Sequence, residues 1–442
     1  MAGTLVLGRA ETVLPDGVGQ DLSGFLSREN PSLGQRDPLY ARALWLDDGE
    51  TTLAWVSVDL LAVNQSLVKY VLWKLRTEHR LAPDMLLVSA IHTHSAPATI
   101  FLANCGVVDR EWNFALRDAL VRLIAQAARA TQEVRLRLTM TDAPGYSHNR
   151  RTQTRDGKTV IGEIPEAEIV RRGPLNTALS VLAAYDAATD RPVAAVVHFA
   201  CHPVFYHDRQ ISADWPGRML ATMRARMGAD FMGMFVQGAC SDVNPVRPSA
   251  STEDNANRMG DALAEAALGC IADAGAGVTL DSRLSGRARM VRLPWRASPD
   301  DEQLTALLLS DADWTHVGRE AQARHLWANR LLNARSRGWW ADGVQMPVQV
   351  VSLGELAVVA LGAEAFTQTA LDLAATHSRR PVLVAGYTNE DVGYLPPAEE
   401  YPYGGYEIER AFRYYGYPDV FSPEAEERVR REAGDLLRRV AT

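Results

Sequence analysis

The sequence lacks the features that mark membrane-spanning, nucleic-acid-binding and disulfide-stabilised proteins. None of its apolar runs approaches the roughly 18 residues that a membrane-spanning helix requires. Its Lys and Arg residues form no basic block of the kind that binds phosphates. Its four cysteines are scattered without a Cys-x-x-Cys pair, so we expect reduced and mostly buried thiols. We therefore expect no integral membrane segment and no nucleic-acid partner.

The beginning of the chain also lacks the basic segment and the apolar stretch of a secretory signal. The net charge is −8, with 47% hydrophobic and 23% charged residues, which is typical of an ordinary globular protein. A length of 442 residues allows two or three domains, but no Pro- or Ser-rich linker divides the chain. We expect a cytoplasmic protein with a single domain over residues 1–442, and the sequence predicts no particular oligomeric state.

Strand-like and helix-like segments follow one another without a strict βαβ period. Apolar, β-branched runs such as residues 51–63 and 85–94 predict buried strands. Helical spacing of apolar residues predicts helices at about 65–82, 110–132, 252–274 and 423–440. The mixture predicts an α/β fold in which mixed β-sheets are flanked by α-helices. The charged, helical residues from about 296 to 340 predict an insertion or cap.

Polar residues stand where several of the expected strands end. In the stretch SAIHTHSAP, residues 89–97, His92 and His94 are two positions apart and therefore share one face of an extended chain. Other expected strands end at or near His202, Asp242, Asn244, Glu364, Asn389 and Tyr394. Such strand ends are where α/β enzymes build their sites. Asp214 follows His202 closely enough for us to expect that its carboxylate orients the imidazole.

Three of these residues have the chemistry of a metal centre. His92, His202 and Glu364 together would offer two nitrogens and one oxygen, a set that is common at hydrolytic zinc sites. They come from distant strands, and the sequence has no His-Glu-x-x-His helix. Spacing alone therefore leaves two alternatives open: histidines that only pack in the core, and manganese or iron in place of zinc.

Four stretches, in the same order along the chain, resemble segments of the neutral ceramidases. They are IHTHSAP (91–97), HFACHPVFYHDRQISAD (198–214), FVQGACSDVNP (235–245) and GYLPPAEEYPYGGYE (393–407). One such motif is weak evidence, but four in the same order are specific. The chain resembles the catalytic domain of the neutral/alkaline non-lysosomal ceramidase-like family, and this implies an α-β-β-α layered fold.

The resemblance also implies a set of ligands. Position by position, it implies that one zinc ion is bound by His92, His202, Glu364 and Tyr394. A tyrosine ligand has to lose its proton or bind weakly, because a free phenol has a pKa near 10.

Three further residues acquire catalytic roles through the resemblance. His94 would face the substrate carbonyl or the leaving amine, and an imidazole titrates near neutral pH. Arg150, in the sequence HNRR, would bind polar atoms of the substrate, and Tyr406 would form a hydrogen bond near the reacting carbonyl. The implied reaction is hydrolysis of a linear N-acyl amide by metal-bound water.

The sequence also departs from the ceramidases. Asn244 stands where they have Ser before Pro, and Gly238 and Ser241 replace a neighbouring Ser and Gly. A serine nucleophile is therefore not expected. The carboxy-terminal immunoglobulin-like domain and the signal peptide of ceramidases have no counterpart in the sequence, so we expect a small-molecule N-acyl amide that is smaller and more soluble than ceramide.

Two kinds of alternative remain open. The same zinc site would also serve ester or lactone hydrolysis, or acyl transfer to an amine. A protein that kept the fold and the metal but lost the activity is the second alternative.

Overall fold

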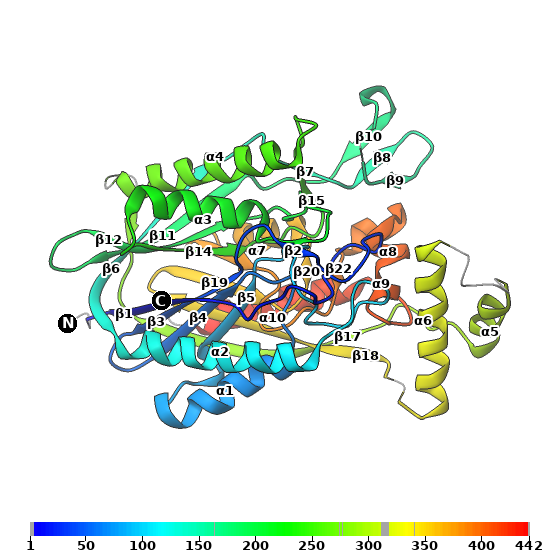
Figure 1. The fold of residues 1–442 in the computed structure, drawn as a ribbon, viewed down its shortest axis with the longest axis horizontal. Helices are drawn as coiled ribbons and strands as arrows, with labels where there is room; N and C mark the ends of the chain where they lie inside the picture. The colour runs from blue at the N-terminus through cyan, green and yellow to red at the C-terminus, as the bar shows by residue number, and fades with distance from the viewer. Residues whose placement is uncertain are drawn as a thin grey trace.

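The computed structural model describes residues 4–440, except residues 163, 274, 276, 311–317 and 340. It consists of mixed β-sheets flanked by α-helices (Figure 1), which confirms the predicted fold class. All four cysteines are buried and unpaired, as expected. Among the described helices, none combines the length and the apolar character needed to cross a membrane.

A large sheet forms most of the molecule. Its strands lie in the order β14 (Met232–Gln237), β12 (Pro192–Phe199), β11 (Ala178–Asp186), β6 (Thr131–Asp142), β1 (Val6–Val13), β3 (Tyr40–Asp47), β4 (Thr52–Val58) and β5 (Leu86–Ala90), and β16 (Val278–Thr279) also pairs with β6. Neighbouring strands are antiparallel, except that β12 pairs with β14 and β4 with β5 in parallel. Parallel neighbours need a crossover connection. The helix α3 (Asp214–Met227) makes one crossover and α1 (Gln65–His79) makes the other.

A smaller sheet packs against the large one and separates two hydrophobic cores. Its strands are β17 (Leu284–Pro294), β18 (Gly343–Leu353), β19 (Leu356–Leu361) and β21 (Val382–Ala385). Successive side chains alternate between its faces. On one face, Val351 and Val358 belong to the main core, which also contains residues of the large sheet. On the other face, Val350 and Val359 belong to a second core, which also contains residues of α10 (Glu424–Arg439). The sheets therefore lie face to face with helices outside, as in an α-β-β-α arrangement.

The covering helices begin at clear capping residues. Asn64 caps α1, Asp109 caps α2 (Arg110–Arg129), and Ser251 caps α4 (Thr252–Ala272), each by accepting a hydrogen bond from a backbone N–H of the first turn. The expected helices at 65–82, 110–132, 252–274 and 423–440 are thus present within a few residues of their predicted ends. The helix α7 (Thr367–Thr376) lies between β20 and β21.

Short paired strands line the loops at one end of the sheets. The pairs are β2 (Gly34–Gln35) with β13 (Gln210–Ile211), β7 (Ser147–Asn149) with β15 (Val243–Pro245), and β20 (Glu364–Ala365) with β22 (Tyr394–Leu395), while β8 (Thr152–Thr154) pairs with both β9 (Thr159–Val160) and β10 (Ile169–Arg172).

The predicted helical segment at about 296–340 contains α5 (Asp301–Ser310) and α6 (Arg319–Ser336), between β17 and β18. Residues 311–317 and 340 lie outside the described residues. The two helices project at the side of the sheets (Figure 1) and have a small core of their own, in which Leu304 packs with Trp327 and Leu331. The division of the chain into one domain stays a prediction.

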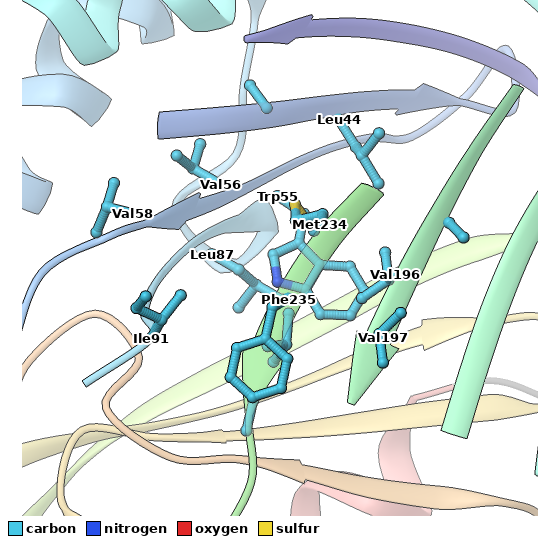
Figure 2. Packing of buried hydrophobic residues seen from close by; sticks show 14 of the residues in the cluster. Leu44, Trp55, Val56, Val58, Leu87, Ile91, Val196, Val197, Met234 and Phe235 are labelled. Carbon is cyan, nitrogen blue, oxygen red and sulfur yellow. The ribbon is translucent and has the colours of Figure 1, made fainter. Parts of the chain in front are cut away.

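The two edges of the large sheet approach each other. Figure 2 shows Trp55 of β4 and Phe235 of β14 packed together, although β14 is one edge strand of the sheet and β4 lies next to the other edge strand, β5. The Ser57 hydroxyl donates a hydrogen bond of 2.5 Å to the carbonyl oxygen of Phe235. As a result, the carboxyl ends of β5, β12 and β14 come close together.

Asn389 joins the two sheets, and this gives a test of the packing. Its side chain accepts a hydrogen bond from the N–H of Val88 in the large sheet and donates to the carbonyl oxygen of Leu86 and to the side chain of Gln349 in the small sheet. We predict that Asn389→Gly lowers the free energy of unfolding by about 3 kcal/mol, because Val88 N–H and Gln349 Oε1 lose their buried partners.

Urea denaturation measures this change. The control Asn333→Ala removes an exposed asparagine of α6 and should change stability by less than about 0.5 kcal/mol. Equal effects of the two substitutions would contradict the role of Asn389 between the sheets.

Candidate metal centre

Three predicted ligands come from strand ends that converge. His92 follows β5, His202 follows β12, and Glu364 begins β20 just after β19 ends. All three side chains are buried. Carboxyl ends of parallel strands are where open α/β sheets bind ligands, and here both sheets contribute.

The ligand atoms lie at the spacing of groups that share one ion. Glu364 Oε2 is 3.6 Å from His92 Nε2 and 3.7 Å from His202 Nε2. Two tetrahedral ligands with bonds near 2.1 Å stand roughly 3.4 Å apart. The structure therefore brings these three atoms close enough to reach a common ion.

Backbone carbonyls fix both imidazoles with Nε2 toward this point. His92 Nδ1 is 2.8 Å from the carbonyl oxygen of Leu61, and His202 Nδ1 is 2.7 Å from that of Cys240 and 3.0 Å from that of Val243. Each Nδ1 thus carries the proton, and each Nε2 has a free lone pair. Among the described residues, the buried His202 Nε2 has no hydrogen-bond partner. An orphaned buried nitrogen beside a buried carboxylate fits a divalent cation.

His94 completes a cluster of three imidazoles that could hold a metal ion. Its Nε2 is 3.4 Å from His92 Nε2. The buried guanidinium of Arg28 donates a hydrogen bond to the backbone oxygen of His94. This bond holds the segment that carries Arg28 against His94. Two ligand sets are compatible with this geometry: His92, His202 and Glu364 with His94 beside them, or all three histidines.

Two backbone positions are specialised for this arrangement. His92 has φ of 68°, in the left-handed region that side chains other than glycine rarely adopt. Gly24 has φ of 109°, and a Cβ atom there would lie 2.5 Å from the ring of His94. Strain of this kind is typical of functional sites.

Burial keeps the imidazoles neutral. It lowers the pKa of His92 to about 3, against the opposing effect of Glu364, and lowers that of His202 to about 3, with Arg150 adding to the effect. Burial, together with His92 and His202, also places the pKa of His94 well below its ordinary value. Neutral imidazole is the form that binds metal ions.

Two tyrosines that the sequence analysis did not single out as site residues hold Glu364. The hydroxyl of Tyr415 donates a hydrogen bond of 2.6 Å to Glu364 Oε1, and that of Tyr387 lies 3.5 Å from Glu364 Oε2. Tyr387 also stacks on His92, with ring centroids 3.9 Å apart. The only sequence signal for Tyr415 is its place among the tyrosines of residues 401–417, and Tyr387 has none.

Tyr394 and Tyr406 both reach the site. Tyr394 pairs directly with Glu364 across β20 and β22. Tyr406 begins α8 (Tyr406–Glu409), and its ring centroid is 5.6 Å from that of Tyr394. Both line one cavity of about 100 Å³ together with His92, His94 and Glu364.

Arg150 lies behind Tyr394 in a buried ionic network. Its Nη2 donates a hydrogen bond of 3.1 Å to the Tyr394 hydroxyl, and its Nε donates one of 3.0 Å to Glu407. The other oxygen of Glu407 accepts a hydrogen bond from Arg151, which also binds Glu400. Burial raises the pKa of Glu407, but Arg150 and Arg151 lower it more strongly, so the pKa lies below its ordinary value. The network ties the segment that carries Arg150 to the segment that carries Tyr406.

The expectation for Asp214 is wrong. Its carboxylate accepts hydrogen bonds from the backbone N–H groups of Phe205, Tyr206 and Trp215. It stands at the start of α3 and shapes the loop after His202 without contacting that imidazole.

A larger cavity, of about 330 Å³, lies between β3 and α3. It is lined by none of the three clustered histidines. In its lining, the buried Arg42 is paired with both Asp59 and Glu11.

The fold and the site define a mixed α/β protein with a buried cluster that could hold a metal ion. Comparisons with known proteins agree with the fold. Residues 14–278 match the model of the neutral/alkaline non-lysosomal ceramidase family, N-terminal part. The chain belongs to this family, which confirms the predicted family and supports a hydrolase that acts on amide bonds. The matched range holds His92, His94, Arg150 and His202, whereas Glu364, Tyr394 and Tyr406 lie beyond it.

Two solved structures share the fold. Neutral ceramidase from Pseudomonas aeruginosa is 18% identical with a TM-score of 0.74, and the match covers 98% of this chain and 74% of that one. A ceramidase complexed with C2 is also 18% identical with a TM-score of 0.75, and the match covers 100% and 76%. A comparison with curated proteins finds no match.

The buried position of Glu407, which is 0% exposed, leads to a prediction. Glu407→Gln should lower the free energy of unfolding by about 3 kcal/mol, because two guanidinium groups lose a buried counter-charge. Chemical denaturation monitored by tryptophan fluorescence measures the change.

The control is Glu166→Gln, which breaks the exposed pair of Glu166 with Arg172. We expect its effect to stay below about 1 kcal/mol. A similar small effect in Glu407→Gln would show that the buried network is not needed for stability.

Proposed function

We propose that the protein is a zinc-dependent hydrolase that cleaves a linear N-acyl amide with water. The observation that carries this proposal is the approach of His92 Nε2, His202 Nε2 and Glu364 Oε2 to one another beside the ring of His94. Two imidazole nitrogens and a carboxylate oxygen are a ligand set that catalytic zinc uses, with a position left for water.

In this proposal His92, His202, Glu364 and Tyr394 hold the ion. When bound, it lowers the pKa of coordinated water toward neutrality and polarises a carbonyl oxygen. Tyr394 is the weakest of the four ligands, because a neutral phenol is a poor donor and a free phenol has a pKa near 10. We therefore assign it the position that yields to substrate.

His94 moves the proton. Its Nε2 faces the ligands, and its backbone is held by Arg28. We propose that His94 Nε2 takes a proton from the attacking water and then gives it to the amine nitrogen as the C–N bond breaks. A histidine that acts as base and then as acid typically contributes 10²–10⁴-fold to the rate.

Tyr406 and Arg150 support the reaction in different ways. Tyr406 lines the cavity, and we propose that its hydroxyl donates a hydrogen bond to the carbonyl oxygen of the substrate. Arg150 does not line the cavity; its Nη2 donates to the Tyr394 hydroxyl. We propose that Arg150 positions Tyr394, which departs from the direct substrate contact expected from the resemblance.

The small size of the cavity, about 100 Å³, supports a substrate smaller than ceramide. Such a substrate would also be more soluble. The cytoplasmic location stays a prediction.

Metal analysis of purified variants separates the two possible ligand sets. We predict one zinc ion per chain in the wild type, its loss in His92→Ala, and its retention in His94→Ala. The reason is that His94 is assigned to proton transfer, so kcat for N-acyl amides should fall about 10²–10⁴-fold in His94→Ala while the metal stays.

His377→Ala is the matched control. This imidazole lies at the end of α7, where its Nδ1 contacts the carbonyl oxygen of Leu373. It should keep both metal and activity. Loss of zinc in His94→Ala would indicate a centre of three histidines, and a wild type without any divalent ion would overturn the proposal.

A further inference from the structure

The cavity next to the candidate metal centre has an apolar wall. His92, His94 and Glu364 form one part of the cavity, and Leu61, Leu102 and Cys105 line another. Leu61, Leu102 and Cys105 pack against one another in a small hydrophobic cluster of their own. Because these side chains support each other, the wall exists without a bound substrate.

This wall offers nothing to a charged group. Among the described residues that line the cavity, Glu364 is the only acidic side chain, and neither Lys nor Arg is present. Burial raises the pKa of the Cys105 thiol to about 12, so the thiol is neutral near pH 7. A charge placed against Leu61, Leu102 and Cys105 would lose its water without gaining an ionic partner there.

The cavity is also small. Its volume is about 100 Å³. An apolar cavity of about 150 Å³ holds benzene, which has six carbons, so the space here suits about four.

The chemistry of an amide limits which part of the substrate can lie along this wall. The amide nitrogen is bonded to the carbonyl carbon, so both atoms have to lie at the metal centre, and only an uncharged part of the substrate suits the wall. The acyl chain carries no polar atom beyond its carbonyl, and the carbonyl has to lie at the metal centre.

We propose that this cavity binds the acyl half of the substrate and selects a short, uncharged acyl chain of about four carbons, with Leu61, Leu102 and Cys105 limiting its length. The proposal rests on the proposed function, because it assumes that the carbonyl group reacts at the metal centre.

Alkanohydroxamates test this without turnover. They bind metal ions through two oxygens and would direct their chain as an acyl group does. We expect their affinity for the zinc-loaded protein, measured by calorimetry, to rise about fourfold per methylene from acetohydroxamate to butyrohydroxamate. It should then level off or fall toward decanohydroxamate. Succinic monohydroxamate, which has the length of butyrohydroxamate but a terminal carboxylate, should bind roughly tenfold more weakly or worse.

Substitutions in the wall should move the preferred length. In Leu102→Ala the strongest binding should shift to six carbons or more, and Cys105→Ala gives a smaller enlargement should Leu102→Ala fold poorly. The control Val107→Ala alters the same loop at a side chain that is 75% exposed and should leave the profile unchanged.

The outcomes separate this inference from the proposed function. Affinity that keeps rising to ten carbons in the wild type, or equal binding of the succinic compound, would overturn the inference even if amides are hydrolysed. The expected length profile without hydrolysis of any N-acyl amide would support the cavity and refute the amidase. Failure of every hydroxamate to bind would contradict both.

Discussion

A buried carboxylate, that of Glu364, is the interaction on which the site depends. It is 3% exposed and faces His92, His202, Tyr387 and Tyr415, which come from four separate segments of the chain. Removing a carboxylate from water is costly unless hydrogen bonds and opposite charge compensate it. The tyrosine hydroxyls supply hydrogen bonds, but the two imidazoles are neutral. A divalent cation between the carboxylate and the two nitrogens would supply the missing positive charge.

A second set of buried charges, around Glu407, supports the site of Glu364. Glu407 bridges Arg150 and Arg151, and Arg150 in turn reaches the hydroxyl of Tyr394. Ion pairs of this kind contribute little net stability compared with apolar packing. Removing one partner nevertheless destabilises the protein strongly, because a buried charge is left unpaired. Their value here is positional, because they hold two loops, one from each half of the chain, at a fixed distance beside the cavity.

The strand ends could be predicted from sequence because apolar, β-branched runs are a local signal, and polar residues at their ends stand out. His92, His202 and Glu364 follow from that signal, and the helix ends follow from caps such as Asn64 and Ser251. The contacts of Tyr387 and Tyr415 could not be predicted, because they depend on the path of loops that no periodicity describes. The prediction for Asp214 was wrong for the same reason. It is close to His202 in sequence, but the nearby backbone N–H groups are better placed to satisfy its carboxylate.

The distribution of the cluster along the chain bears on how the protein is made. His92 and His202 extend from the large sheet, whereas Glu364 and Tyr394 extend from the smaller one, and Asn389 joins the two sheets. A nascent chain that has released only its first 300 residues from the ribosome lacks the carboxylate altogether. Assembly of the cluster is therefore a late event in biosynthesis, and metal occupancy would report that both sheets have docked.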